Sequence, residues 1–331
     1  MNLVDFGASP IPSLEDIAIR LIDEIEEGPE DYIPGLLPRA GSCVIAGSTN
    51  IGKSLGALEI CSSLITGNKL WGELEPTFKA RKILYVLGEH TDEVIQRLWQ
   101  HTKLPMTDQV FLLGPEALGY DKWVVSGAKP NLHSINKFKR WAEGCDLIVW
   151  DPFSSFVCGS ADAENDNVGM RLVLDSMNLV AQTVGASNLI LAHQGKPQMD
   201  KFGNEQSRKT YAIRGASAIE DASTNIFYLD KAKGESEAAQ RAADGEIYSL
   251  TCRKYKGIAP PEYRLLRDPD TLTHRLLGNR PFVEVKRIAT QARLGKLLAH
   301  VHGIDRNQAI LILAALQDCS ERTIRRDLGL D

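Results

Sequence analysis

The chain has 331 residues, of which 43% are hydrophobic and 24% charged, and its formal net charge is −5. This length suffices for one large or two smaller soluble globular domains, and the negative charge excludes nucleic-acid binding through bulk charge, so any such surface must be local. No signal peptide precedes the acidic amino end and no apolar stretch approaches the roughly 20 residues of a membrane span, so we expect a cytoplasmic protein without a membrane partner.

Residues 1–33 are predicted to form an acidic, helical lead-in. Ser13 followed three positions later by Asp16 is typical of a helix cap, and isoleucines and leucines at helical spacing follow them. The pair Gly28-Pro29 ends the helix. We expect this helix to pack on a neighbouring surface of the same chain or of another subunit.

Short apolar strands alternate with helical segments across residues 34–280. Helices are expected to begin near Lys53, Thr91, Leu132 and Asn167. The expected strands are Cys43–Ala46, Ile83–Leu87, Val110–Leu113, Leu147–Trp150 and Leu189–Ala192. This alternation predicts an α/β fold, a mainly parallel sheet with helices on both faces.

The pattern changes after Ile226, where strands follow one another in quick succession. The segments Ile226–Leu229, Ile247–Thr251 and Tyr263–Leu266 predict antiparallel strands at one edge of the sheet, with a polar excursion from Lys231 to Gly245.

Residues 286–331 are predicted to form a separate helical piece. An apolar helix over Asn307–Leu316 is followed by Ser320 and a helix carrying Arg322, Arg325 and Arg326. Two helices with a short break are compatible with a DNA-binding helix-turn-helix or with packing on a subunit surface.

A loop motif of the form G-x-x-x-x-G-K-S spans Gly47 to Ser54, between a short apolar strand and a helix. Its glycines let backbone N–H groups surround a phosphate, and the helix N-terminus adds its dipole. We expect Lys53 to bridge the β- and γ-phosphates of ATP and Ser54 to bind Mg²⁺. The expected nucleotide-binding residues are Gly47, Ser48, Thr49, Asn50, Ile51, Gly52, Lys53, Ser54 and Leu55.

Carboxylates follow two further strands. Asp151 ends the apolar run that starts at Asp146 and is expected to hold Mg²⁺ beside Ser54. Glu89 follows Ile83–Leu87, and because ligands gather at the carboxyl ends of parallel strands, it is placed to deprotonate the attacking water. The alternative for Glu89 is a helix cap or a surface acid.

His193 and Gln194 follow a third strand, Leu189–Ala192. At this position they are candidates for sensing the γ-phosphate and signalling to the following loop. The alternative is a buried histidine with one structural hydrogen bond.

The order of these motifs resembles that of the RecA/DnaB-like ATPases, and most of all the RepA-type hexameric replicative helicases of plasmids and phages. The resemblance covers about residues 32–268 and includes the segments 31–41, 214–221 and 251–257. It implies a RecA-like P-loop core, with Glu89 as the catalytic base, Lys53 in the catalytic loop and His193 as the γ-phosphate sensor.

The same resemblance implies a homo-oligomeric ring, with a hexamer as the expected state, in which each nucleotide lies between two subunits. A basic residue of the neighbour then completes the site. The candidates for this role are Arg214, Lys254 and Lys256, although an arginine is more usual than a lysine.

The polar loop 195–211 is a candidate surface for single-stranded DNA. Its cations Lys196, Lys201, Arg208 and Lys209 outnumber its acids, and Phe202 and Tyr211 could stack on bases. The alternative is an ordinary solvated loop. The loop 158–167 carries acids that would repel DNA.

These features favour an ATP-hydrolysing, RepA-like DNA helicase or translocase that works with Mg²⁺, single-stranded DNA and a primase or replication initiator. The first alternative is a RecA-fold regulatory or recombination-mediator ATPase that binds DNA or protein without unwinding. The second is a DNA-bound adaptor or transcription regulator whose ATPase acts only as a switch. A metabolic kinase is disfavoured because neither an acceptor-site signature nor a lid segment is evident.

Overall fold

The computed structural model describes most of the chain from residue 31 onward. The described residues are 31–119, 125–126, 129–158, 167–194, 216–232, 246–256, 259–277, 291, 294–295, 297–298, 301, 304–316, 320–328 and 330. The predicted lead-in up to residue 30 lies outside them, as do the basic loop from residue 195, the polar excursion from residue 233 and the acidic residues 162–166.

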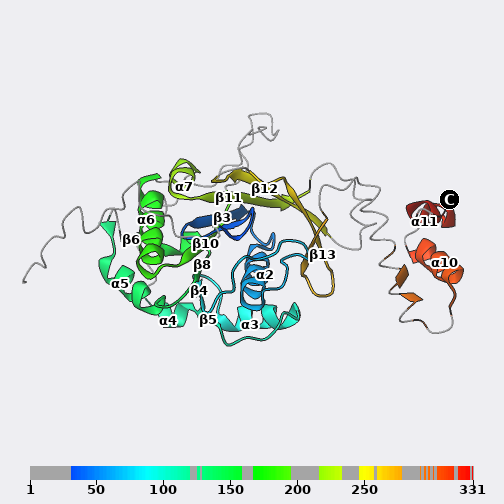
Figure 1. The fold of residues 1–331 in the computed structure, drawn as a ribbon, viewed down its shortest axis with the longest axis horizontal. Coiled ribbons are helices and arrows are strands. Elements are labelled where there is room, and N and C mark those ends of the chain that lie inside the picture. Colours follow the sequence, from blue (N-terminus) through cyan, green and yellow to red (C-terminus); the bar gives the residue numbers. More distant parts are fainter. Residues whose placement is uncertain are drawn as a thin grey trace, which may run out of the picture.

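A nine-stranded sheet forms the centre of the molecule, in the order β14-β13-β12-β11-β3-β10-β8-β4-β5 (Figure 1). The parallel strands are β3 (Ser42–Gly47), β4 (Ile83–Leu87), β5 (Val110–Leu113), β8 (Leu147–Asp151), β10 (Ser187–His193) and β11 (Asn225–Lys231). The antiparallel strands at one edge are β12 (Glu246–Lys254), β13 (Tyr263–Arg267) and β14 (His274–Leu276).

This arrangement confirms the predicted α/β fold with a mainly parallel sheet and antiparallel edge strands. Every predicted strand is present, and no predicted strand end differs from the observed one by more than three residues. The short strand β14 was not predicted, because three residues, His-Arg-Leu, are too few to show an alternating pattern.

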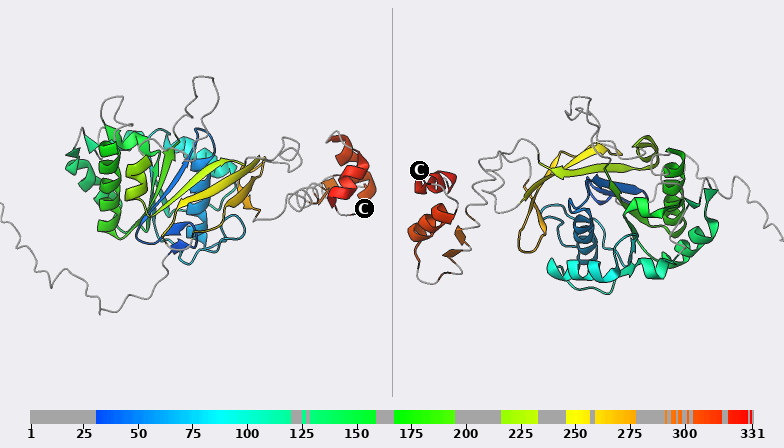
Figure 2. Two further views of the ribbon diagram at one scale, coloured as in Figure 1. Left: turned by 90° about the horizontal axis from the view of Figure 1, so that it is seen from above. Right: turned by 180° about the vertical axis from the view of Figure 1, so that it is seen from behind.

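Helices cover both faces of the sheet (Figures 1 and 2). On one face lie α2 (Lys53–Thr66) and α3 (Asp92–His101), and on the other lie α5 (Leu132–Trp141), α6 (Asn167–Val184) and α7 (Ala216–Ala222). Alternate residues of each strand enter the two cores: Ile45 packs toward α2, and Val44 packs toward α6. The strands are apolar throughout because both of their faces are buried.

Short elements connect and flank these layers. They are β1 (Asp31–Ile33), β2 (Leu37–Pro38), α4 (Pro115–Leu118), β6 (Val125–Ser126), β7 (Lys129–Pro130), the 3₁₀ turn η2 (Phe153–Phe156) and β9 (Val157–Cys158). Residues 31–33, assigned by sequence to the helical lead-in, form β1 instead, because Tyr32 and Ile33 bury their side chains in the α2 core.

Two helices, α10 (Arg306–Leu316) and α11 (Glu321–Leu328), pack on each other through Ile310, Leu313 and Ile324. The guanidinium group of Arg325 joins them, since it donates to Asn307 (3.0 Å) and to Glu321 (2.8 Å). Its hydrogen bonds are therefore directed within the helix pair. Among the described residues, no helix is both long and apolar enough to cross a membrane.

Gly47 ends β3 where backbone from β11 comes very close. A Cβ atom at Gly47 would lie 2.6 Å from the carbonyl oxygen of Leu229. Gly47→Ala is therefore expected to lower the free energy of unfolding by about 1–3 kcal/mol, the usual cost of overpacking a tight site. Urea denaturation followed by circular dichroism measures this change.

Gly56→Ala is the matched control, because a Cβ atom at Gly56 in α2 would meet no atom within 4 Å. It should leave stability unchanged or raise it by up to about 1 kcal/mol through helix propensity. Equal effects of the two substitutions would contradict the close approach at Gly47.

Candidate functional site

The phosphate-loop sequence forms a tight turn between β3 and α2. Asn50 (φ 61°) and Gly52 (φ 105°) take left-handed backbone conformations, and Gly52 is the N-cap residue of α2. Turns of this kind point successive N–H groups into one concavity, and the first amides of the helix add to it. The backbone here is suited to hold an anion.

Lys53, the first residue of α2, is buried at 6% relative exposure, and its side chain folds back over the loop. Its Nζ donates to the carbonyl oxygens of Gly47 (3.0 Å) and Ser48 (2.8 Å). Burial lowers the pKa of Lys53 to about 8, while the charges of Asp151 and Glu89 act in the opposite direction. Both carboxylates are therefore within electrostatic reach of this amine.

Asp151 ends β8 and is buried, and Tyr85 of β4 donates to its carboxylate at 2.8 Å. The hydroxyl of Ser54 is a hydrogen-bonding neighbour of the same phenol. Burial, and then the charge of Asp151, raise the pKa of Tyr85 well above its ordinary value, so the phenol keeps its proton. Tyr85 thus connects the two predicted Mg²⁺ ligands.

Sequence analysis did not identify Tyr85, although a signal was present. A phenol at the centre of the apolar run Ile83–Leu87 must be buried and must find a hydrogen-bond partner there. Which partner it finds depends on the pairing of β4 with β8.

The chemistry of these donors fits Mg²⁺. The ion prefers oxygen ligands and is commonly held by one or two carboxylates together with substrate phosphates. Ser54 and Asp151 supply a hydroxyl and a buried carboxylate beside the phosphate loop. Within the described ranges, no cluster of three or more His, Cys, Asp or Glu side chains suggests a different metal centre.

Glu89 lies just beyond the carboxyl end of β4, beside β8, where Leu87 pairs with Asp151. Its side chain is exposed, and the hydroxyl of Ser155 donates to it at 3.4 Å. The turn before it is tight: Gly88 N–H donates to the Asp151 carbonyl at 2.7 Å. The next residue, His90, is also exposed.

His193 ends β10 directly beside the phosphate loop, because it pairs with Gly47 in the parallel register. The next residue, Gln194, donates its backbone N–H to the Gly47 carbonyl at 3.0 Å. The first glycine of the loop is thus bonded to the start of the segment that follows β10.

Lys254 and Lys256 lie away from this site, at the end of the sheet where the parallel strands begin. Lys254 pairs with Ile226, which pairs with Val44, three residues or about 10 Å along the strand from Gly47. The amine of Lys254 donates to the Glu220 carbonyl of α7, and Lys256 is exposed. Neither lysine is placed to complete the site of its own chain.

The remaining candidates lie outside the described residues. They are Arg214, for the neighbouring site, and Lys196, Lys201, Arg208 and Lys209, for DNA.

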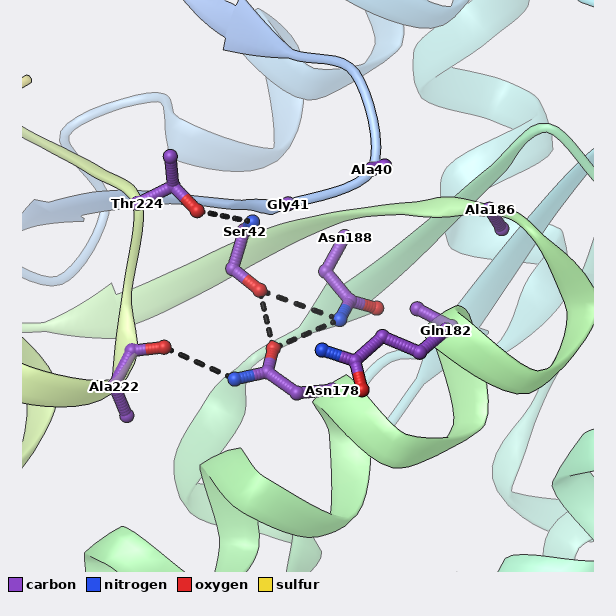
Figure 3. Close-up of a pocket in the computed structure, with 10 residues that line it drawn as sticks. Ala40, Gly41, Ser42, Asn178, Gln182, Ala186, Asn188, Ala222 and Thr224 are labelled. Carbon is purple, nitrogen blue, oxygen red and sulfur yellow. Dashed lines mark hydrogen bonds between the residues drawn. The ribbon is translucent and has the colours of Figure 1, made fainter. Parts of the chain in front are cut away.

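A polar cavity of about 120 Å³ lies at the amino ends of β3 and β10, on the side of the sheet away from the phosphate loop (Figure 3). Asn178 of α6 accepts hydrogen bonds from Ser42 and Asn188 and donates to the Ala222 carbonyl at 3.0 Å. Because these polar groups bond to one another, we interpret the cavity as part of the framework that joins α6 and α7 to the sheet.

Comparison with known proteins gives one family match: a family described as an AAA domain matches residues 8–199. No curated protein matches the sequence. A KaiC-like protein from the hyperthermophilic archaeon Pyrococcus horikoshii OT3 is similar in structure (TM-score 0.47, 12% identity, 75% of this chain and 94% of that chain). So is the flagellar accessory protein FlaH of Methanocaldococcus jannaschii (TM-score 0.46, 10% identity, 72% and 90%). Both TM-scores are below 0.5, so neither likeness bears on function.

The lowered pKa of Lys53 predicts how nucleotide binding depends on pH. Phosphate binding favours the charged amine, so affinity should be constant below pH 8 and should fall as the pH rises above it, by at most about tenfold per unit. Titrations with fluorescent ADP between pH 6.5 and 9.5 measure this. Lys53→Arg stays charged and should remove the dependence; a wild-type affinity constant up to pH 9.5 would contradict the assignment.

Proposed function

The chain belongs to the AAA domain family, and from this premise we propose that it hydrolyses Mg²⁺-ATP as a ring-forming, RepA-like DNA helicase or translocase. One observation carries the ATPase part of the proposal. The buried amine of Lys53 lies within electrostatic reach of both Asp151 and Glu89. Asp151 ends β8, and Glu89 lies just beyond the end of the neighbouring strand β4. Phosphoryl-transfer sites need this combination of a cation and two carboxylates.

Each residue has a distinct task in the proposed reaction. The loop amides and Lys53 bind the phosphates, and Lys53 exchanges its two carbonyl partners for phosphate oxygens. Ser54 and Asp151 hold Mg²⁺, which neutralises charge on the phosphates when it is bound. The Tyr85 hydrogen bond to Asp151 keeps that carboxylate facing Ser54.

Glu89 is proposed to accept a proton from the attacking water. Its carboxylate is exposed to solvent, so a water can reach it, and the Ser155 hydroxyl limits its rotation. His193 is proposed to respond to the γ-phosphate. Its pairing with Gly47 supports this role, because a movement of the loop on loss of the γ-phosphate would also displace the end of β10.

The proposed ring places each nucleotide between two subunits, with a basic residue of the neighbour completing the site. Lys254 and Lys256 lie at the sheet edge remote from their own phosphate loop, which supports a role toward a neighbouring subunit. Arg214 remains a further candidate.

Single-stranded DNA is the proposed track, bound through Lys196, Lys201, Arg208 and Lys209, with a primase or replication initiator as a further partner. The alternative, a regulatory or recombination-mediator ATPase that does not unwind DNA, uses the same ATP site. The formal net charge of −5 keeps this alternative in view, because bulk charge does not attract DNA.

Glu89→Gln tests the catalytic assignment. The amide cannot accept a proton from water, so kcat for ATP hydrolysis should fall by roughly 10²–10⁴-fold while binding of fluorescent ADP is retained. Glu93→Gln, an exposed acid in the first turn of the following helix, is the matched control and should hydrolyse ATP normally. Unchanged hydrolysis by Glu89→Gln would exclude Glu89 as the base.

The effect of single-stranded DNA on the rate of ATP hydrolysis tests whether the protein is a DNA translocase. For a translocase, hydrolysis by the purified chain should rise several-fold with DNA, and the rise should be absent in Glu89→Gln. Hydrolysis that is indifferent to DNA would reject the translocase. Stimulation without displacement of a labelled strand from a forked duplex would favour the non-unwinding alternative.

A further inference from the structure

A cluster of charged and aromatic side chains lies beside the phosphate loop and has no part in the reaction proposed above. It comes from the start of β12 and the end of β13, where Glu246 pairs with Arg267. Because β12 runs antiparallel to β11, its first residues lie at the edge where the parallel strands end. The topology therefore brings Arg267 to the end of the sheet that carries the phosphate loop.

The guanidinium group of Arg267 lies against Gly52. Its Nη1 is 3.6 Å from the position that a Cβ atom on Gly52 would take, an ordinary van der Waals contact. Gly52 is the left-handed N-cap residue of α2, where the amides that face the phosphates begin. The Arg267 side chain is 22% exposed, so part of the guanidinium group is accessible to solvent.

Two contacts hold this guanidinium in place. It donates to the Glu246 carboxylate and lies over the Tyr248 ring, with 4.9 Å from Cζ to the ring centroid. Glu246 also accepts hydrogen bonds from Tyr248 and, at 2.7 Å, from Lys231. The Lys231 hydrogen bond above all, followed by that of Tyr248, lowers the pKa of Glu246, so this carboxylate is ionised. Two cations around one anion leave an excess of one positive charge.

The support beneath Arg267 is joined to the phosphate-loop helix itself. The Tyr248 ring meets His274 edge-on at 5.8 Å, and His274 Nδ1 bonds to Glu59 of α2 at 2.6 Å. Glu59 also accepts from the backbone N–H of His274, at 2.6 Å. Because His274 and Glu59 are both buried, this connection is stiff. Arg267 and the phosphate loop are therefore held in one fixed relation.

We propose that Arg267 is a nucleotide-binding residue that acts within its own chain and contacts the phosphates of a nucleoside di- or triphosphate in the Gly47–Ser54 loop. The inference rests on the nucleotide site of the proposed function. A guanidinium suits this task because its planar fork of donors matches phosphate oxygens and stays charged. Arg267 lies beside the phosphate loop of its own chain, whereas Lys254 and Lys256 lie at the other end of the strands, where the parallel strands begin.

The test is binding of fluorescent ADP to the full chain in the presence of Mg²⁺. Arg267→Ala should weaken binding by about tenfold, the usual effect of losing one charge-assisted contact. Arg267→Lys keeps the charge and most of the stem, and should weaken binding less. Arg275→Ala is the matched control, since Arg275 is exposed and lies on the alternate face of the β13–β14 hairpin; its affinity should equal that of the wild type.

Lys53→Ala separates failure of this inference from failure of the function. If the wild type binds ADP, Lys53→Ala does not and Arg267→Ala binds like the wild type, the role of Arg267 is rejected and the nucleotide site stands. If the wild type binds no nucleotide, the proposed function itself is rejected. Should Arg267→Ala unfold below the assay temperature, Arg267→Lys decides: wild-type affinity would reject the proposal, and several-fold weaker binding would support it.

Discussion

Gly47 is the residue on which the geometry of the site depends. It ends β3 between two other strands, paired with His193 on one side and Leu229 on the other. A Cβ atom would collide with the Leu229 carbonyl oxygen, so only glycine lets three backbones meet here. Its own carbonyl accepts hydrogen bonds from Lys53 and from Gln194. The side chain of Lys53 and the backbone that follows β10 thus bond to the same carbonyl oxygen of the loop.

Burial of charge is the second constraint, and it shapes the chemistry. Lys53 and Asp151 are both nearly inaccessible to water, and charged groups in such places need partners. Lys53 has two carbonyl oxygens, and Asp151 has the Tyr85 phenol. These contacts give both buried groups hydrogen-bond partners within the protein. Glu89, in contrast, is exposed to solvent, which fits the role proposed for it.

The antiparallel strands extend the site as well as the sheet. In a purely parallel sheet, all the strands that end near the phosphates would be followed by loops. Because β12 runs antiparallel to its neighbours, β12 begins with Glu246 and β13 ends with Arg267 at the end of the sheet that carries the phosphate loop. The Glu59–His274 contact then ties this edge to α2 across 215 residues of sequence. The phosphate loop is therefore supported from both sides of β3.

Local patterns in the sequence were enough to predict eight of the nine strands of the central sheet, the helix starts near Lys53, Thr91, Leu132 and Asn167, and the loop itself. A buried strand between helices leaves an apolar run, and a phosphate loop needs glycines at fixed spacing, so each signal lies within a few residues. The parallel order of these runs also predicted that Glu89, Asp151 and His193 would share an edge with Lys53, since ligands gather at the carboxyl ends of such strands.

Only the tertiary structure decided which side chains meet. Tyr85 and Asp151 are 66 residues apart, and Arg267 reaches Gly52 from beyond 200 residues away. Strand order and register determine these contacts, and a shift of one residue would turn each side chain to the other face. The sequence therefore determined the chemistry available at the phosphate edge. Folding decided how that chemistry is assembled, because a partner that is distant in the chain leaves no local pattern.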